Sequence, residues 1–221
     1  QNLDDFDTDN DPSKYFDVRT YTGTGSALTL TLNFGPDLVW LLNRGGGGTH
    51  RVNDQILGTN KYLKLEQNSA TTSEANNITA WNSDGYTIGT NGDINSSGGS
   101  YVSYNWDAGT SAATASTDGS ITPSAQWVNT TAGFSITKWT GSGANATIGH
   151  ALGAQPHMLI VKRLNSAADW RVYHQSLGNA KAGILHEHVG GSNLNTSMWQ
   201  STDPTNTVVS LSSDANGNAS G

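Results

Sequence analysis

The chain has 221 residues, of which 13% are charged and 34% hydrophobic, a formal net charge of −7 and no cysteine. The negative charge disfavours a nucleic-acid partner, because phosphates require a basic face, and the lack of cysteine excludes disulfides and thiolate metal sites. No signal peptide or apolar run of transmembrane length is visible, so no membrane insertion is expected. Abundant Gly, Ser, Thr and Asn, without sustained helical periodicity, predict an all-β protein.

Residues 1–14 form an acidic segment that holds five of the eighteen acidic side chains. Asp5, Asp7 and Asp9 alternate with other residues in it, and closely spaced carboxylates are ligands that Ca²⁺ prefers. The Gly and Glu positions of an EF-hand loop are missing. Two interpretations stay open. One is a calcium site on Asp5, Asp7 and Asp9, and calcium is the only cofactor that the sequence suggests. The other is a solvated acidic linker, which is favoured because runs of charged residues usually stay solvated.

The segment 15–108 is interpreted as a first β repeat made of short strands. Leu28, Leu30 and Leu32 alternate with polar residues, which predicts a strand with one buried face. Residues 38–42 are apolar throughout and predict a central strand. Similar runs bounded by turn residues predict strands at 16–21, 51–58, 61–65, 79–81, 86–88 and 101–106. The stretches 45–48, 67–78 and 91–100 are expected to be loops.

A second copy of this pattern follows. Residues 109–132, rich in Ala, Ser, Thr and Gly, are interpreted as a linker with a hairpin, and 133–221 as repeat two. At a spacing of 118, Phe16 and Gly23 are matched by Phe134 and Gly141. After a two-residue insertion, Arg51 is matched by Arg171 at a spacing of 120. Because glycines and apolar residues dominate the matches, the two copies are expected to share backbone geometry and core.

Repeat two lacks one element. Residues 216–221 align with the loop that precedes the strand 101–106 of repeat one, and no counterpart of that strand follows. We expect that the polypeptide continues past Gly221, so that repeat two is truncated here. This expectation is favoured because an open sheet edge is a liability. The alternative is that another chain supplies the strand.

Few residues suggest chemistry. His186 and His188 would share one face of a strand, but two ligands are too few for a zinc site. Glu66, Glu74 and Asp84 cannot be paired as the two carboxylates of a glycosidase. No Gly-x-Ser-x-Gly elbow is present. No catalytic residue is identified, and the sequence predicts a protein that is not an enzyme.

Tryptophan is more informative, because an exposed ring can stack on the CH face of a sugar while Asn and Asp bond its hydroxyls. Trp170 lies beside Asp169 next to a loop and is expected to be exposed, and Trp127 is the only large side chain of its segment. We predict ligand binding by Trp170, Asp169 and Trp127. Trp81 and Trp199 are expected in the core, because both repeats retain them.

Several short sequence segments, spread over nearly the whole chain, resemble those of a known family: residues 13–17, 21–25, 35–40, 117–121, 130–136 and 173–178. As a set they resemble a repeat family found in structural and tail-fibre-like proteins of marine bacteriophages. The resemblance implies a concanavalin-like β-sandwich carried on a virion appendage. It implies no catalytic residues.

The predicted fold is therefore all-β, with two tandem antiparallel β-sandwich repeats of jelly-roll or concanavalin-like type, the second without its closing strand. A single sandwich with strands from both copies is the rival architecture. The predicted function is a structural or adhesion module at a virion surface, or otherwise extracellular, with copies of itself, other virion proteins and host glycans as partners. The alternative is a secreted bacterial carbohydrate-binding module or adhesin. A polysaccharide-degrading enzyme is the least favoured class.

Overall fold

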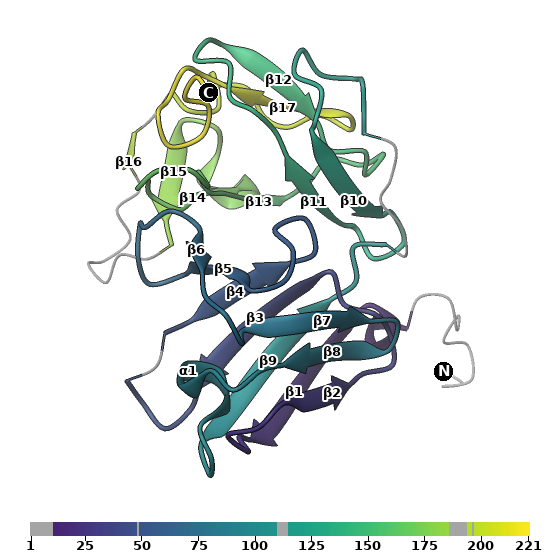
Figure 1. Cartoon of the computed structure of the whole chain (residues 1–221). Helices are drawn as coiled ribbons and strands as arrows, with labels where there is room; N and C mark the ends of the chain where they lie inside the picture. Colours follow the sequence, from purple (N-terminus) through teal and green to yellow (C-terminus); the bar gives the residue numbers. More distant parts are fainter. Residues whose placement is uncertain (1–10, 48, 110–114, 186–193, 196) are drawn as a thin grey trace. The chain divides into compact units, whose positions relative to one another are not determined.

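The computed structural model describes residues 11–47, 49–109, 115–185, 194–195 and 197–221 (Figure 1). Its regular structure is mostly antiparallel β, with one short α-helix, so the all-β prediction is confirmed at this level. The chain divides into two compact units: unit 1 comprises Gln1–Tyr62 and Ser73–Thr110, and unit 2 comprises Leu63–Thr72 and Ser111–Gly221. The strands of the described residues form separate open sheets, and none closes on itself.

The first two sheets lie in the N-terminal half of the chain, after a 3-10 helix, η3 (Pro12–Lys14). The larger sheet has six strands in the order β1 (Phe16–Thr22), β9 (Ser100–Trp106), β3 (Leu38–Asn43), β4 (Arg51–Asp54), β5 (Lys61–Lys64) and β6 (Thr72–Ser73). The smaller has three, in the order β2 (Leu28–Thr31), β8 (Gly85–Ile88) and β7 (Ile78–Asn82). The helix α1 (Gly92–Asn95) lies in the connection from β8 to β9.

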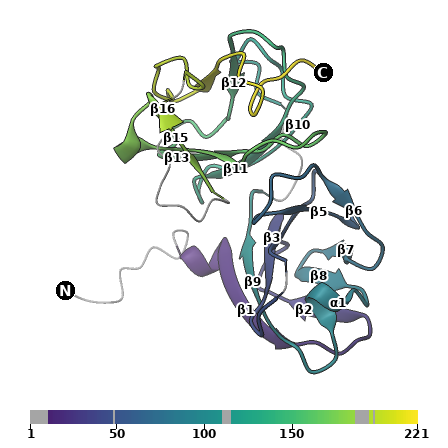
Figure 2. The same cartoon turned by 90° about the vertical axis from the view of Figure 1, so that its left-hand side faces the viewer.

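The core of unit 1 lies between these two sheets, which Figure 2 shows as two layers. Val39 and Leu41 of β3 contribute from the six-stranded sheet, and Tyr86 and Ile88 of β8 contribute from the three-stranded sheet; all four are fully buried. Residues that alternate with them along each strand point to the opposite face, as the period of a β-strand requires. The six-stranded sheet therefore has an inner face toward the core and an outer face away from it.

Unit 2 contains smaller sheets. Four strands follow the order β13 (Met158–Val161), β14 (Arg171–His174), β15 (Lys181–Ile184) and β16 (Leu194–Asn195), with a 3-10 helix, η4 (Gln175–Leu177), after β14. Two pairs are β10 (Ala125–Asn129) with β11 (Phe134–Lys138) and β12 (Ala146–Gly149) with β17 (Val208–Leu211). Its core includes Tyr173 and Trp199, each 1% exposed.

Part of the segment interpreted as a linker is a strand. Residues 125–129 form β10, which pairs along its whole length with β11. The polar composition of this segment does not exclude burial, because Gln126 is 1% exposed and its amide donates to the Gly149 carbonyl and to Thr137 Oγ1. The hydrogen bonds replace those that the amide would make with water.

One turn recurs in both units and is fixed by an asparagine. In unit 1, the side-chain oxygen of Asn95 accepts the Thr24 N–H at 2.8 Å, and its amide nitrogen donates to the carbonyls of Ser26 and Gly89. A Cβ at Gly23 would collide with the Ser96 carbonyl, so this close approach requires glycine.

The corresponding residue of unit 2 is Asn218. Its side-chain oxygen accepts the Ser142 N–H at 2.9 Å, and its amide nitrogen donates to the carbonyls of Ala144 and Ser212. A Cβ at Gly141 would meet the Ala219 carbonyl, as at Gly23 in unit 1. The two turns thus have the same hydrogen-bonding pattern, and they contain the matched glycines Gly23 and Gly141.

Candidate functional site

The outer face of the six-stranded sheet carries a row of aromatic side chains. Strand β9 lies between β1 and β3, with Trp106 opposite Phe16, and with Tyr104 opposite both Val18 and Trp40. Directly opposed residues share a face of the sheet. The residues that alternate with Tyr104 and Trp106 along β9, such as Asn105, are fully buried on the inner face. The rings of Phe16, Trp106, Tyr104 and Trp40 therefore project from the outer face.

The rings form a continuous chain of contacts. Ring centroids are 5.1 Å apart for Phe16 and Trp106, 6.5 Å for Trp106 and Tyr104, and 5.4 Å for Tyr104 and Trp40. His50, just before β4, lies 5.8 Å from Trp40 and ends the row. These distances are those of favourable aromatic pairs, so the rings hold one another in place. We call Phe16, Trp106, Tyr104, Trp40 and His50 the aromatic row.

The aromatic row remains accessible to solvent. Phe16 is 37% exposed, its β1 neighbour Val18 is 44% exposed, and Trp106, Tyr104 and Trp40 are each partly exposed. An exposed apolar patch of this kind on a soluble protein usually marks an interaction surface. Its rigid, mutually packed rings offer flat apolar surfaces at little cost in side-chain entropy.

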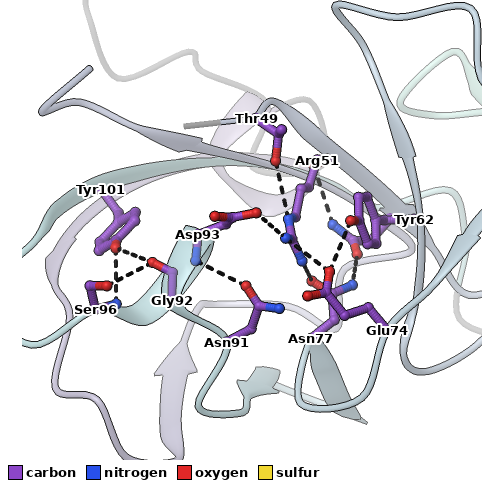
Figure 3. Close-up of polar contacts among 11 residues, drawn as sticks. Thr49, Arg51, Tyr62, Glu74, Asn77, Asn91, Gly92, Asp93, Ser96 and Tyr101 are labelled. Atoms are coloured by element: carbon purple, nitrogen blue, oxygen red, sulfur yellow. Dashed lines mark hydrogen bonds and ion pairs between the residues drawn. The ribbon is translucent and has the colours of Figure 1, made fainter. Parts of the chain in front are cut away.

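The inner side of unit 1 holds a polar cluster around Arg51 of β4 (Figure 3). The Arg51 side chain is fully buried, and its Nη2 contacts the carboxylates of Glu74, at 3.0 Å, and Asp93. Nη1 donates to Asn77, Nε donates to Thr49, and the guanidinium carbon lies 4.1 Å from the centre of the Tyr62 ring. A buried charge is tolerated when it is paired and hydrogen-bonded in this way.

The electrostatics of the cluster follow from these contacts. Burial alone would raise the pKa of Glu74, but the hydroxyl of Tyr62 and the charge of Arg51 outweigh it and leave this pKa below its ordinary value. Burial and the neighbouring Glu74 raise the pKa of Tyr62 to about 12. Glu74 is therefore ionised and Tyr62 protonated at neutral pH, and both hold Arg51. The arrangement joins β4 to α1 and to the segment before β7, which is a structural role.

The residues predicted from sequence to bind a ligand are not brought together. Trp170 is buried, with 4% of its surface exposed, and its indole N–H donates to the carbonyls of Lys64 and Gln67, so the expected exposed ring is wrong. The Asp169 carboxylate pairs with Arg171 at 3.1 Å. Trp127 is partly exposed on β10, opposite Ile136 of β11.

The other residues that the sequence analysis singled out also lie apart from one another. Glu74 belongs to the Arg51 cluster, and Asp84 is exposed in the turn between β7 and β8. Trp199 is in the core as expected, and Trp81 is partly buried against the core of unit 1. The calcium prediction on Asp5, Asp7 and Asp9, and the pair His186 and His188, lie outside the described residues. Within the described ranges, no group of three His, Cys, Asp or Glu side chains is placed to hold a metal ion.

Sequence reasoning missed the aromatic row. The alternation of Tyr and Trp with polar residues in 101–106 predicts the strand and its two faces. It does not indicate that this strand lies between β1 and β3, and this order is what aligns Phe16 and Trp40 with the rings of β9.

Comparison with known proteins identifies the family of the chain. A family model described as a domain of unknown function, DUF7483, matches residues 11–221. No curated protein and no solved structure matches the chain. No helix in the described part of the chain is long and apolar enough to cross a membrane.

Proposed function

The chain belongs to the DUF7483 family, a domain of unknown function, and we propose that it is a non-enzymatic adhesion module that binds glycans through the aromatic row. The observation that carries the proposal is the unbroken series of partly exposed rings from Phe16 to Trp40 across three adjacent strands. In this proposal each unit acts as a β-sandwich of concanavalin-like type, which the two layers of unit 1 support.

The chemistry of the row suits a carbohydrate. The CH faces of a sugar ring are apolar and stack on aromatic rings, whereas the hydroxyls need polar partners at the sides. The imidazole of His50 provides a polar group at one end of the row. Because the row crosses three strands spaced about 4.8 Å apart, it fits an extended chain of sugar units better than a single small molecule.

The test is a glycan array followed by titration of the best ligand. We expect Trp106→Ala and Phe16→Ala to weaken binding about tenfold or more, because truncation of an aromatic anchor commonly costs about 1–2 kcal/mol or more. Trp127→Ala is the matched control, since Trp127 is also a partly exposed tryptophan on a strand face, but in unit 2. No binding to any glycan, or equal loss in Trp106→Ala and Trp127→Ala, would contradict the proposal.

The biological setting is a second part of the proposal. The sequence resemblance supports a virion appendage, and the alternative of a secreted bacterial binding module would use the same row. Neighbouring portal, tail-tube or capsid genes would support the first setting, whereas secretion or surface-attachment genes would support the second. Incubation with a bound polysaccharide is expected to leave its chain length unchanged, and depolymerisation would overturn the non-enzymatic assignment.

A further inference from the structure

The two units differ at one place in their sheets. In the six-stranded sheet, β9 lies between β1 and β3 and pairs with both. The strands of unit 2 that match β1 and β3 in the repeat are β11 and β13, and they belong to different sheets. Figures 1 and 2 both draw β11 beside β13 within unit 2. Among the described residues, no strand joins them.

One edge of β13 is paired with β14, and no described residue forms a strand on its other edge. The Gln175 N–H donates to the His157 carbonyl, so the odd-numbered residues of this strand direct their backbone groups toward β14. Successive residues of a strand alternate in this direction. The backbone groups of Met158 and Ile160 therefore point to the other edge, where the matching strand β3 meets β9.

In the part of the chain that the structure describes, β11 likewise has a strand, β10, on one edge only. In unit 1, the Gly23 N–H donates to the Gly99 carbonyl, so odd-numbered residues of β1 face β9. In unit 2, Lys138 accepts the Ser124 N–H, so even-numbered residues of β11 face β10. Since the repeat spacing of 118 is even, β10 lies on the opposite edge of β11 from the position that β9 takes on β1.

Side-chain exposure also points to the position between β11 and β13. Met158 is 52% exposed and Ile160 is 51% exposed, and they are the two most exposed large hydrophobic residues in the described part of the chain. Their counterparts Leu38 and Trp40 are partly buried beside β9. The backbone edge and the apolar surface thus coincide.

We propose that unit 2 is a strand acceptor, which takes an extended peptide segment between β11 and β13. The segment has the chemistry of β9: Tyr and Trp at alternate positions to pack over Ile160 and Met158, with small or polar residues such as Ser103 between them. It runs antiparallel to both strands, as β9 does to β1 and β3. This binding mode is β-strand addition, in which backbone hydrogen bonds provide affinity and alternate side chains provide specificity.

An inserted strand fits these observations better than a second copy of the chain. Edge-to-edge pairing of two β13 strands would bond one edge in each copy and leave the edge of β11 opposite β10 without a strand. A single inserted strand bonds both edges and covers Met158 and Ile160. We therefore infer that a strand inserts between β11 and β13, and a dimer that pairs through β13 is the competing outcome of the test.

The test uses the full chain and a fluorescent peptide with the sequence of residues 99–107. The control peptide has the same sequence with N-methyl groups on the amides that correspond to Val102 and Tyr104, which face β3 in unit 1 and would face β13 here. We expect the first peptide to bind at least tenfold more tightly than the second. Hydrogen exchange at the Ile160 amide should slow on binding, while exchange at Leu159, which faces β14, should not change.

A pair of variants locates the site. Ile160→Lys should weaken peptide binding about tenfold or more, and Val18→Lys, at a similarly exposed strand position of unit 1, should leave binding unchanged. No binding, equal binding of both peptides, or loss of binding in Val18→Lys instead would overturn the proposal. So would a dimer of the chain that Ile160→Lys converts to a monomer.

Discussion

Asp37 provides a direct test of how burial sets the stability of unit 1. Its side chain is 1% exposed, one carboxylate oxygen accepts the Ala108 N–H at 2.7 Å, and the other accepts a hydrogen bond from Gln55 at 3.0 Å. Burial, with the nearby carboxylate of Asp107, raises its pKa from 3.8 to about 7. The folded state therefore holds the Asp37 proton more tightly than the unfolded state.

The sign and size of the effect follow from proton linkage. Because the pKa is raised on folding, the stabilisation is present below about pH 4 and is lost as the pH rises to about 7. A shift of roughly three pH units corresponds to about 4 kcal/mol, of which about 3 kcal/mol falls between pH 5 and pH 8. The substitution Asp37→Asn removes the titration and keeps an oxygen that can accept the Ala108 N–H.

The assay is urea unfolding at pH 5, 6, 7 and 8, followed by tryptophan fluorescence. The transition that Leu41→Ala shifts identifies unit 1, because Leu41 lies in its core. The free energy of unfolding of the unchanged chain should fall relative to that of Asp37→Asn by about 3 kcal/mol over this range. Asp84→Asn, an exposed substitution with the same charge change, should follow the unchanged chain. Parallel profiles for the unchanged chain and Asp37→Asn would refute the reasoning.

Two further predictions concern buried polar groups. Arg51→Met should destabilise unit 1 by about 2 kcal/mol, because it leaves the side-chain oxygen of the fully buried Asn77 without its donor. Arg19→Met, which breaks the pair with Asp17 at an exposed side chain, should cost under about 1 kcal/mol in the same unfolding assay. Similar costs for both arginines would count against this account of the cluster. Asn218→Ala should destabilise unit 2 by about 2–3 kcal/mol, because three hydrogen bonds are lost. The control Asn165→Ala, at an exposed position, should change the urea midpoint little. An unshifted midpoint for Asn218→Ala would show that the turn holds without its side chain.

Local patterns were sufficient to predict several strands. The alternating leucines correspond to β2, the apolar run at 38–42 lies within β3, and residues 101–106 lie within β9. Each of these signals comes from neighbouring residues of one strand, and the period of two is a local property. The helix α1 falls in a predicted loop, because four residues are too few to produce a helical period.

Long-range contacts could not be predicted in this way. Trp170 is buried because the carbonyls of Lys64 and Gln67, more than 100 residues earlier, accept its indole N–H. No property of the residues around Trp170 indicates these partners. The same reason applies to the segment Leu63–Thr72, which groups with unit 2, and to the aromatic row, whose rings come from strands 16–22, 38–43 and 100–106.

The asparagine turns have a consequence for folding during synthesis. Asn95 bonds Thr24 across 71 residues, and Asn218 bonds Ser142 across 76 residues, so each turn is completed by a residue made near the end of its unit. Contacts of such large sequence separation form late, because the loop must close before the contact is made. A ribosome adds about 5–20 residues per second, so the early strands of each unit are exposed for several seconds before their turn can close. Chaperone binding is therefore expected to peak just before Asn95 and Asn218 emerge from the ribosome.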